Sequence, residues 1–341
     1  MTALLVAVRD ALLVLSRESG RWVADSRFSG KSRLQCVATD PRRPERIYCG
    51  TSRDGLWRSD DLGRSWTPVG SGRLADHVTA VAVSAVERGA ANDSVVYAGT
   101  EPSALYRSAD AGESWEERHS LLALPSSSSW SFPPRPNTSH VRWIAPDPLV
   151  PERIFVAIEA GALVTSPDSG LTWTDRRPDG PYDTHTLVVH PHAAGRLYSA
   201  AGDGYFESMT SGVSWERRED GLTHRYVYGL AVEADDPDTV LISAARGAMS
   251  AHDASRAESW IFRRTSGEPW RAVSRGLPES RGTTISSLIS DPSDPAVVYA
   301  ANNHGVYRSD DMGESWKRLG ILWPESYHSE RVAGLAVTTA N

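Results

Sequence analysis

The sequence predicts an all-β protein, a seven-bladed β-propeller of four-stranded antiparallel blades that is closed by the C-terminal strand joining the N-terminal blade. Three observations carry this prediction: a short motif recurs along the chain, strand-like segments surround each copy, and the two chain ends supply complementary parts of one unit. Four short strands in a repeat of roughly 40–50 residues are typical of propeller blades. The 341 residues are therefore interpreted as one domain, 1–341.

The repeated motif is eight residues long and ends in tryptophan. Good copies lie at 59–66 (SDDLGRSW), 108–115 (SADAGESW), 166–173 (SPDSGLTW) and 309–316 (SDDMGESW). The copy at 208–215 has Thr210 in place of the aspartate, and those at 16–22 and 263–270 are eroded. Aligned on tryptophan, the units are marked by Trp22, Trp66, Trp115, Trp173, Trp215, Trp270 and Trp316.

Each unit follows one order of elements. A strand such as VTAVAVS leads into a polar turn, often Asp-Pro, and a second strand follows, such as VVYAGT. After a loop comes a third strand such as ALYRS, then the motif, then a fourth strand that starts at tryptophan. The motif glycine suits a turn that needs positive φ, and its aspartate can accept backbone N–H bonds within the turn. We therefore expect the motif to be structural and not catalytic.

The two ends of the chain complete the ring. Residues 2–26 supply only three strands, and residues 331–339 resemble a lone first strand. Pairing of 331–339 with the N-terminal strand would remove both exposed sheet edges.

Composition excludes several classes of function. The formal net charge is −7, and lysine and arginine are scattered along the chain, so neither nucleic acid nor a membrane surface is expected as a partner. Arg9 and Asp10 interrupt the apolar N-terminus, and two cysteines cannot form a disulfide framework. These features favour a cytoplasmic location.

The innermost strands carry the most informative pattern. Their first positions are Arg33, His77, His140, Asp183, Tyr226, Thr284 and Arg331. Two residues further, the positions are Gln35, Thr79, Arg142, His185, Tyr228, Ser286 and Ala333. Two residues further again, every position is apolar: Val37, Val81, Ile144, Leu187, Leu230, Leu288 and Leu335. Because side chains alternate along a strand, this predicts an axial funnel that is polar at its mouth and apolar deeper.

The funnel residues suggest roles in binding and in acid–base chemistry. We expect His140, His185, Asp183 and Tyr226 to be the catalytic candidates, and the ligand-binding candidates to be Arg33, His77, Arg142, Tyr228, Arg331 and His304. Arginine can bind carboxylate or phosphate, tyrosine can stack, and histidine can transfer protons. Further carboxylates on the same face are Asp54, Glu101, Glu159 and Asp203. His140, His185 and Asp183 could meet near the axis as metal ligands, but no close-spaced metal signature and no cofactor fingerprint is present, so no metal or cofactor is expected.

Two insertions fall on the face that carries the funnel mouth. One is the Ser/Pro-rich segment 119–140, and the other spans 246–258. Loops on a rigid scaffold commonly carry function, so the 119–140 segment is a candidate contact for a protein partner.

The pattern S-x-D-x-G-x-[ST]-W is the Asp-box, or BNR repeat, and the chain resembles the Asp-box propeller superfamily over its whole length. Members include sialidases, xyloglucan-directed glycoside hydrolases, the sortilin ectodomain and photosystem II assembly factors of the Ycf48/HCF136 type. This resemblance implies the fold and places the boxes away from the ligand site. Two functions stay open: binding of a small polar, anionic or sugar-like ligand, with glycoside hydrolase or lyase chemistry, or a non-catalytic scaffold of the Ycf48/HCF136 type.

Overall fold

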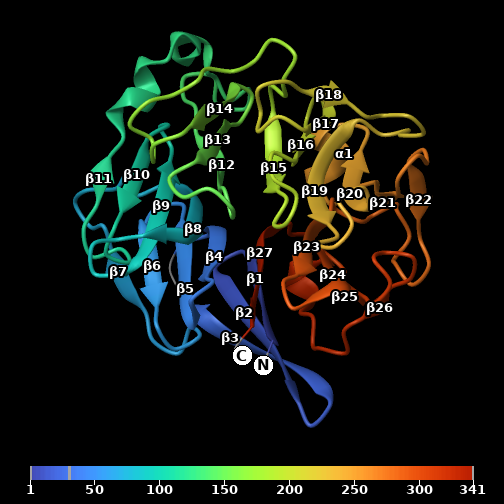
Figure 1. The fold of residues 1–341 in the computed structure, drawn as a ribbon. Coiled ribbons are helices and arrows are strands. Elements are labelled where there is room, and N and C mark those ends of the chain that lie inside the picture. The colour runs from blue at the N-terminus through green and yellow to red at the C-terminus, as the bar shows by residue number, and fades with distance from the viewer. Residues whose placement is uncertain (1, 30–31, 340–341) are drawn as a thin grey trace.

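The ring predicted from the repeats is present. The computed structural model describes residues 2–29 and 32–339 of the chain. Within these residues the strands form seven antiparallel sheets around one axis (Figure 1). The described part contains no helix that is both long and apolar enough to cross a membrane.

Each sheet is one blade, and its strands run in order from the axis outwards. Blade 1 contains β27 (Val332–Thr339), β1 (Thr2–Val8), β2 (Ala11–Glu18) and β3 (Arg21–Ser29). Blade 2 contains β4 (Leu34–Asp40), β5 (Arg43–Thr51), β6 (Leu56–Ser59) and β7 (Thr67–Val69). Blade 3 contains β8 (Val78–Arg88), β9 (Ser94–Thr100), β10 (Leu105–Ser108) and β11 (Glu116–Glu117). Blade 4 contains β12 (Val141–Pro146), β13 (Ile154–Ile158) and β14 (Ala162–Ser166).

The remaining blades follow the same order. Blade 5 contains β15 (Thr184–Val189), β16 (Leu197–Ala201), β17 (Gly204–Ser208) and β18 (Glu216–Arg217). Blade 6 contains β19 (Tyr226–Val232), β20 (Val240–Ala245), β21 (Ser259–Arg264) and β22 (Arg271–Val273). Blade 7 contains β23 (Ser287–Asp291), β24 (Asp294–Asn302), β25 (Gly305–Ser309) and β26 (Lys317–Arg318). Short helices lie in connections: η1 (His119–Ala123), η2 (Pro125–Ser129), α1 (Ala248–His252) and η3 (Glu325–Tyr327).

The ring closes as the sequence predicts. Strand β27 pairs antiparallel with β1, with Leu4 opposite Val337 and Val6 opposite Leu335. In Figure 1 the red β27 lies beside the blue β1. The two ends of the chain thus build one blade, and the inner edge of β1 is covered.

The apolar core is divided among the spaces between blades. Seven hydrophobic clusters of the described residues each join two neighbouring blades. The motif tryptophan of each unit belongs to one of them; Trp66, for example, packs edge-on against Phe28 with ring centroids 5.0 Å apart. These tryptophans fill the spaces between the blades, since one motif tryptophan lies in each of the seven clusters.

The Asp-box turns have the predicted internal bonding. Oδ1 of Asp311 accepts the backbone N–H of Ser315 at 2.9 Å, and its Oδ2 accepts the Ser315 hydroxyl at 2.6 Å. Gly313 has φ +85°, where an added Cβ would be strained. In the equivalent turn, hydrogen bonds from Ser65 hold the pKa of Asp61 at about 2. These carboxylates are occupied by their own turns, which supports a structural role.

We expect Asp311→Ala to lower the free energy of unfolding by about 1–3 kcal/mol, because three hydrogen-bond donors lose their acceptor. Urea denaturation followed by tryptophan fluorescence measures the change. Thr210→Ala is the matched comparison, since the Thr210 hydroxyl in the equivalent turn accepts the Ser214 N–H but carries no charge. A larger loss in Thr210→Ala than in Asp311→Ala would contradict this account of the motif.

Blade 4 departs from the four-stranded prediction. Its expected outer strand is reduced to a single bridge between Thr165 and Thr174. The insertion 119–140 packs at this place: Leu121, Leu124 and Trp130 enter the cluster between blades 3 and 4, and Ser126 binds Asp175 next to the bridge. The insertion is ordered and covers this side of the blade.

Candidate functional site

The inner strands begin at one face of the ring, and several start with a β-bulge. Pairing in blade 4 skips from Val141 to Trp143, and in blade 5 from Thr184 to Thr186. The skipped residues are the second funnel positions Arg142 and His185; Gln35 and Thr79 are skipped in the same way. A bulge redirects the side chain at the extra residue. The direction of the polar side chains at the second position of these inner strands is therefore set by bulges and not by strict alternation of side chains along the strand.

The deeper part of the axis is mostly apolar. A cavity of about 280 Å³ lies below Arg142 and is lined by Val37, Val81, Ile144 and Leu335 of the predicted apolar level. Ile289, and not Leu288, lines it from blade 7. Leu187, Leu230 and Leu288 are instead buried in the clusters between blades. The apolar third positions of the inner strands thus divide into two groups: some line the axial cavity, and the others are buried between blades.

At the mouth, His140 and Arg142 meet a carboxylate that comes from another loop. His140 Nε2 lies 2.8 Å from Oε2 of Glu159, in the β13–β14 loop, and Arg142 Nε lies 3.5 Å from the same oxygen. Arg142 also donates to the Tyr228 hydroxyl at 2.7 Å, and its guanidinium lies over the Tyr228 ring. Blades 4 and 6 are joined across the axis by these contacts.

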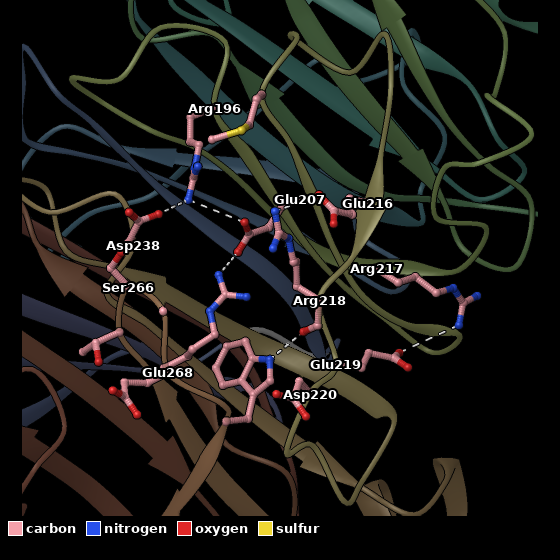
Figure 2. A pocket seen from close by; sticks show the side chains of 15 residues that line it. Arg196, Glu207, Glu216, Arg217, Arg218, Glu219, Asp220, Asp238, Ser266 and Glu268 are labelled. Carbon is pink, nitrogen blue, oxygen red and sulfur yellow. Dashed lines mark hydrogen bonds and ion pairs between the residues drawn. The ribbon is translucent and has the colours of Figure 1, made fainter.

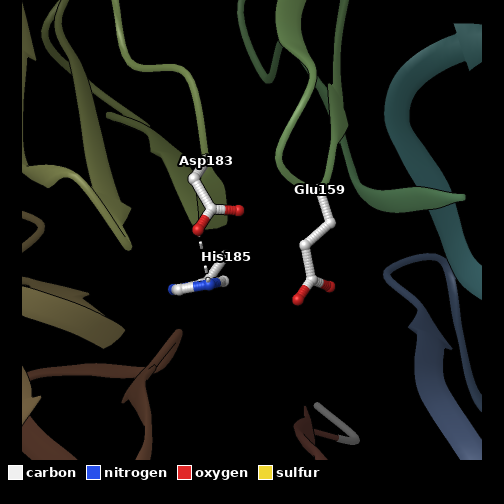
Figure 3. A group of neighbouring side chains, drawn as sticks. All are labelled: Glu159, Asp183 and His185. Carbon is white, nitrogen blue, oxygen red and sulfur yellow. Dashed lines mark ion pairs between the residues drawn. The ribbon is translucent and has the colours of Figure 1, made fainter. Parts of the chain in front are cut away.

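Asp183, His185 and Tyr226 lie beside this group. Asp183 Oδ2 is 3.7 Å from His185 Nε2, and the His185 ring lies 4.9 Å from the Tyr226 ring. The Tyr226 hydroxyl is 3.0 Å from Nε2 of His252, which α1 brings in from the second insertion. Figure 3 shows Glu159, Asp183 and His185 directed toward a common space. The structure therefore brings together the four catalytic candidates His140, His185, Asp183 and Tyr226.

The first insertion reaches the same mouth. His77 Nδ1 lies 3.5 Å from Glu101, and Arg135 of the insertion binds Glu101 through two hydrogen bonds of 2.8 and 2.6 Å. Phe132 packs edge-on against His140 with centroids 4.8 Å apart. Segment 119–140 thus forms one wall of the site.

Other predicted residues lie elsewhere or have other partners. Arg33 is exposed and paired with Glu330. His304 contacts the Gly282 carbonyl at 3.0 Å and lies beside His328. Arg331 is exposed, and its charge acts on His252. Among the ligand-binding candidates, His77, Arg142 and Tyr228 join the cluster, whereas no contact described here places Arg33 or His304 in it.

Burial and neighbouring charges separate the pKa values of the cluster. Burial, together with the charge of Glu159, raises the pKa of Asp183. Burial alone would raise the pKa of Glu159, but the His140 hydrogen bond and the Arg142 charge hold it well below its usual range. Burial, with the charge of Arg331, lowers the pKa of His252 to about 3, so this ring is neutral at pH 7.

Three residues of the cluster were not predicted as site residues. Glu101 and Glu159 were candidates only as carboxylates on the correct face, and His252 only as part of an insertion. All three come from loops, so the inner-strand alignment does not reveal them. The position of two of them in the sequence could have identified them: Glu101 and Glu159 directly follow the second strand of their blades, at the end that meets the funnel mouth.

A larger charged cleft lies between blades 5 and 6, and most of its charged side chains pair with one another. Its volume is about 500 Å³, and dashed lines in Figure 2 join several of its charged side chains, such as Arg196 with Asp238 and Glu207 with Arg264. Glu207 pairs with Arg264 and Arg196, and Arg196 also pairs with Asp238. These groups stabilise the blade interface.

Comparison with known proteins shows the fold. No family model and no curated protein matches the chain. Among solved structures, an ancestral GH74 enzyme has a TM-score of 0.65 and 18% identity over 84% of this chain and 38% of that one. The GH74 enzyme of Niastella koreensis has a TM-score of 0.68 and 16% identity over 95% and 52%. Ycf48 bound to a D1 peptide has a TM-score of 0.59 and 15% identity over 91% and 94%.

The chain is thus a seven-bladed propeller structurally similar to GH74 and Ycf48 propellers, which are of the Asp-box type. It spans about half or less of the length of the GH74 structures. At these identities the similarity extends to the fold alone.

Proposed function

We propose that the axial mouth binds a small polyhydroxylated, sugar-like ligand. The observation that carries the proposal is a set of buried ring nitrogens without hydrogen-bond partners. They belong to four histidines of the mouth: His77 Nε2, His140 Nδ1, His185 Nε2 and His252 Nδ1. Buried polar atoms are normally hydrogen-bonded, so a group of orphaned ones at one place indicates a missing polar partner.

Charge favours a sugar-like ligand over an anionic one. Glu101, Glu159 and Asp183 would repel an anion, and Arg135 and Arg142 already contact carboxylates. Carboxylates and neutral imidazoles can accept hydrogen bonds from hydroxyl groups, and Tyr226 adds a hydroxyl of its own. The arginine triad of a sialidase-like arrangement is less well supported, because Arg33 is engaged with Glu330 and Arg142 with Tyr228.

The alternative is a protein-binding scaffold, as the similarity to Ycf48 bound to a D1 peptide suggests. The 119–140 segment gives it limited support. Trp130, the tryptophan of this segment, is buried in the core with 8% of its surface exposed. A partner would instead meet Leu122, two serines and three prolines, which are exposed: Ser128, Ser129, Pro133, Pro134 and Pro136.

A thermal-shift screen of neutral sugars, sugar acids and inorganic phosphate tests the proposal, with hits measured by calorimetry and assayed for turnover. Ligand binding to the native state raises the melting temperature, and the rise grows with the logarithm of the ratio of ligand concentration to dissociation constant. We expect neutral sugars to give the hits. His140→Gln and Tyr226→Phe should each lower the affinity for these sugars at least about tenfold, because each removes one good hydrogen bond to a buried partner.

Tyr307→Phe is the matched control, because Tyr307 lies on β25 and away from the axis. No sugar hit, or hits that are unchanged in His140→Gln and Tyr226→Phe, would overturn the proposal. Hits confined to phosphate and sugar acids would show that the ligand is anionic.

A further inference from the structure

We propose that Glu159, Asp183 and His185 form a binding site for a divalent transition-metal ion of the Zn²⁺ or Mn²⁺ class. Each offers one ligand atom, and these atoms all lie within 4.8 Å of one another. The three residues come from the β13–β14 loop of blade 4 and the start of β15 in blade 5, and they converge in Figure 3. The sequence carried no close-spaced metal signature because these ligands are contributed by two blades.

His185 is oriented as a metal ligand. Its side chain is 1% exposed, and its Nδ1 donates to the Val227 carbonyl at 2.7 Å. With the proton held on Nδ1, Nε2 presents a lone pair, the arrangement seen in most metal-binding histidines. Nε2 has no hydrogen-bond partner and faces Oδ2 of Asp183 at 3.7 Å. A nitrogen lone pair and a carboxylate oxygen that face each other at this distance are suited to bind one cation between them.

The carboxylates are also held by neighbouring groups. The Ala160 N–H binds Oδ1 of Asp183 at 2.7 Å, and the Asp183 N–H binds Asp203 at 3.1 Å. His140 and Arg142 both approach Oε2 of Glu159. These contacts occupy one oxygen of each carboxylate and leave Oδ2 and Oε1 for a ligand. Such second partners orient metal ligands and are commonly found around metal sites.

Size and charge fit a small dication. Zn²⁺ bonds to nitrogen and oxygen are about 2.0–2.2 Å long, which places tetrahedral ligand atoms about 3.4 Å apart. The His185–Asp183 separation of 3.7 Å is close to this value, and the ligand atom of Glu159 lies within 4.8 Å of the other two. One imidazole and two carboxylates suit zinc or manganese better than calcium, which prefers oxygen ligands alone.

Three protein ligands leave open coordination positions. Glu159 and Asp183 are 18% and 23% exposed, so these positions face the mouth. Resting on the proposed function, we infer that hydroxyl groups of the sugar-like ligand coordinate the ion there.

Calorimetric titration of the EDTA-treated and dialysed full chain with Zn²⁺ and Mn²⁺ tests metal binding without any sugar. We expect about one ion per chain, with affinity at least tenfold weaker in Asp183→Asn and in His185→Gln, as is common when ligand shells are altered. Co²⁺ provides a second readout, because its visible absorption reports coordination by nitrogen and oxygen ligands. Glu101→Gln is the matched control: it removes a buried carboxylate of the same mouth that lies outside the triad.

Failure to bind Zn²⁺, Mn²⁺ or Co²⁺ would overturn the metal site and leave the sugar proposal standing. Equal binding by Asp183→Asn, His185→Gln and the wild type would show an adventitious ion only. Metal binding without any effect of the ion on sugar affinity would confirm the site and overturn the inferred coordination of the sugar.

Discussion

A chain that ends at Arg331, and so lacks β27, will lose the native ring. Strand β27 pairs along the full length of β1, and its apolar side chains enter both clusters that flank blade 1: Val332 and Val337 on one side, Ala336 on the other. Burial of an apolar side chain contributes about 1.5–3 kcal/mol, so removal of several approaches the total stability of about 5–15 kcal/mol of a typical protein. The exposed edge of β1 also favours aggregation.

Circular dichroism melting and size-exclusion chromatography measure this effect. We expect the truncated chain to lack a cooperative transition or to aggregate. A circular permutant that starts at Val332 and joins Asn341 to Met1 is the control, because Thr339 lies opposite Thr2 in the sheet. It has the same composition and retains closure, so it should melt cooperatively. A truncated chain that melts like the wild type would refute the closure argument.

The fold was predictable because the repeats encode it locally. In the four intact boxes the glycine and aspartate specify a turn through bonds within eight residues, and the tryptophan of each unit specifies contact with the neighbouring blade. Seven such units, with complementary ends, leave little choice of architecture. The reduction of the outer strand of blade 4 to one bridge was not predictable, because the 119–140 insertion packs against that blade and the residues around Thr174 carry no signal of it.

The candidate site was predictable only in part. The polar first positions of the inner strands follow from strand direction, and His140, Asp183 and Tyr226 do meet. The alternation of side chains along the inner strands does not predict the positions beyond the bulges at Arg142 and His185. A bulge depends on pairing with the next strand and not on local residue type. Glu101, Glu159 and His252 reach the axis from loops, whose course no periodicity describes.

Trp130→Ala is expected to release the wall of the site. Trp130 packs with Leu121 and Leu124 in the core between blades 3 and 4, and its ring lies over Gly161, where an added Cβ would be 3.1 Å from the indole. Loss of a buried tryptophan side chain costs about 3–5 kcal/mol. We expect a decrease of this size in the free energy of unfolding, measured by urea denaturation.

The same variant will also change local dynamics, because the buried indole is the apolar anchor of the segment that carries Phe132 and Arg135 to the mouth. Hydrogen exchange over residues 125–138 should become faster than in the wild type, and the pairing of Arg135 with Glu101 should weaken. Leu122→Ala is the control in the same segment, since Leu122 is 49% exposed and its loss should cost less than about 0.5 kcal/mol. Equal exchange in the two variants would mean that the polar contacts of Ser126 and Arg135 alone hold the wall, and that the burial of Trp130 serves only the blade interface.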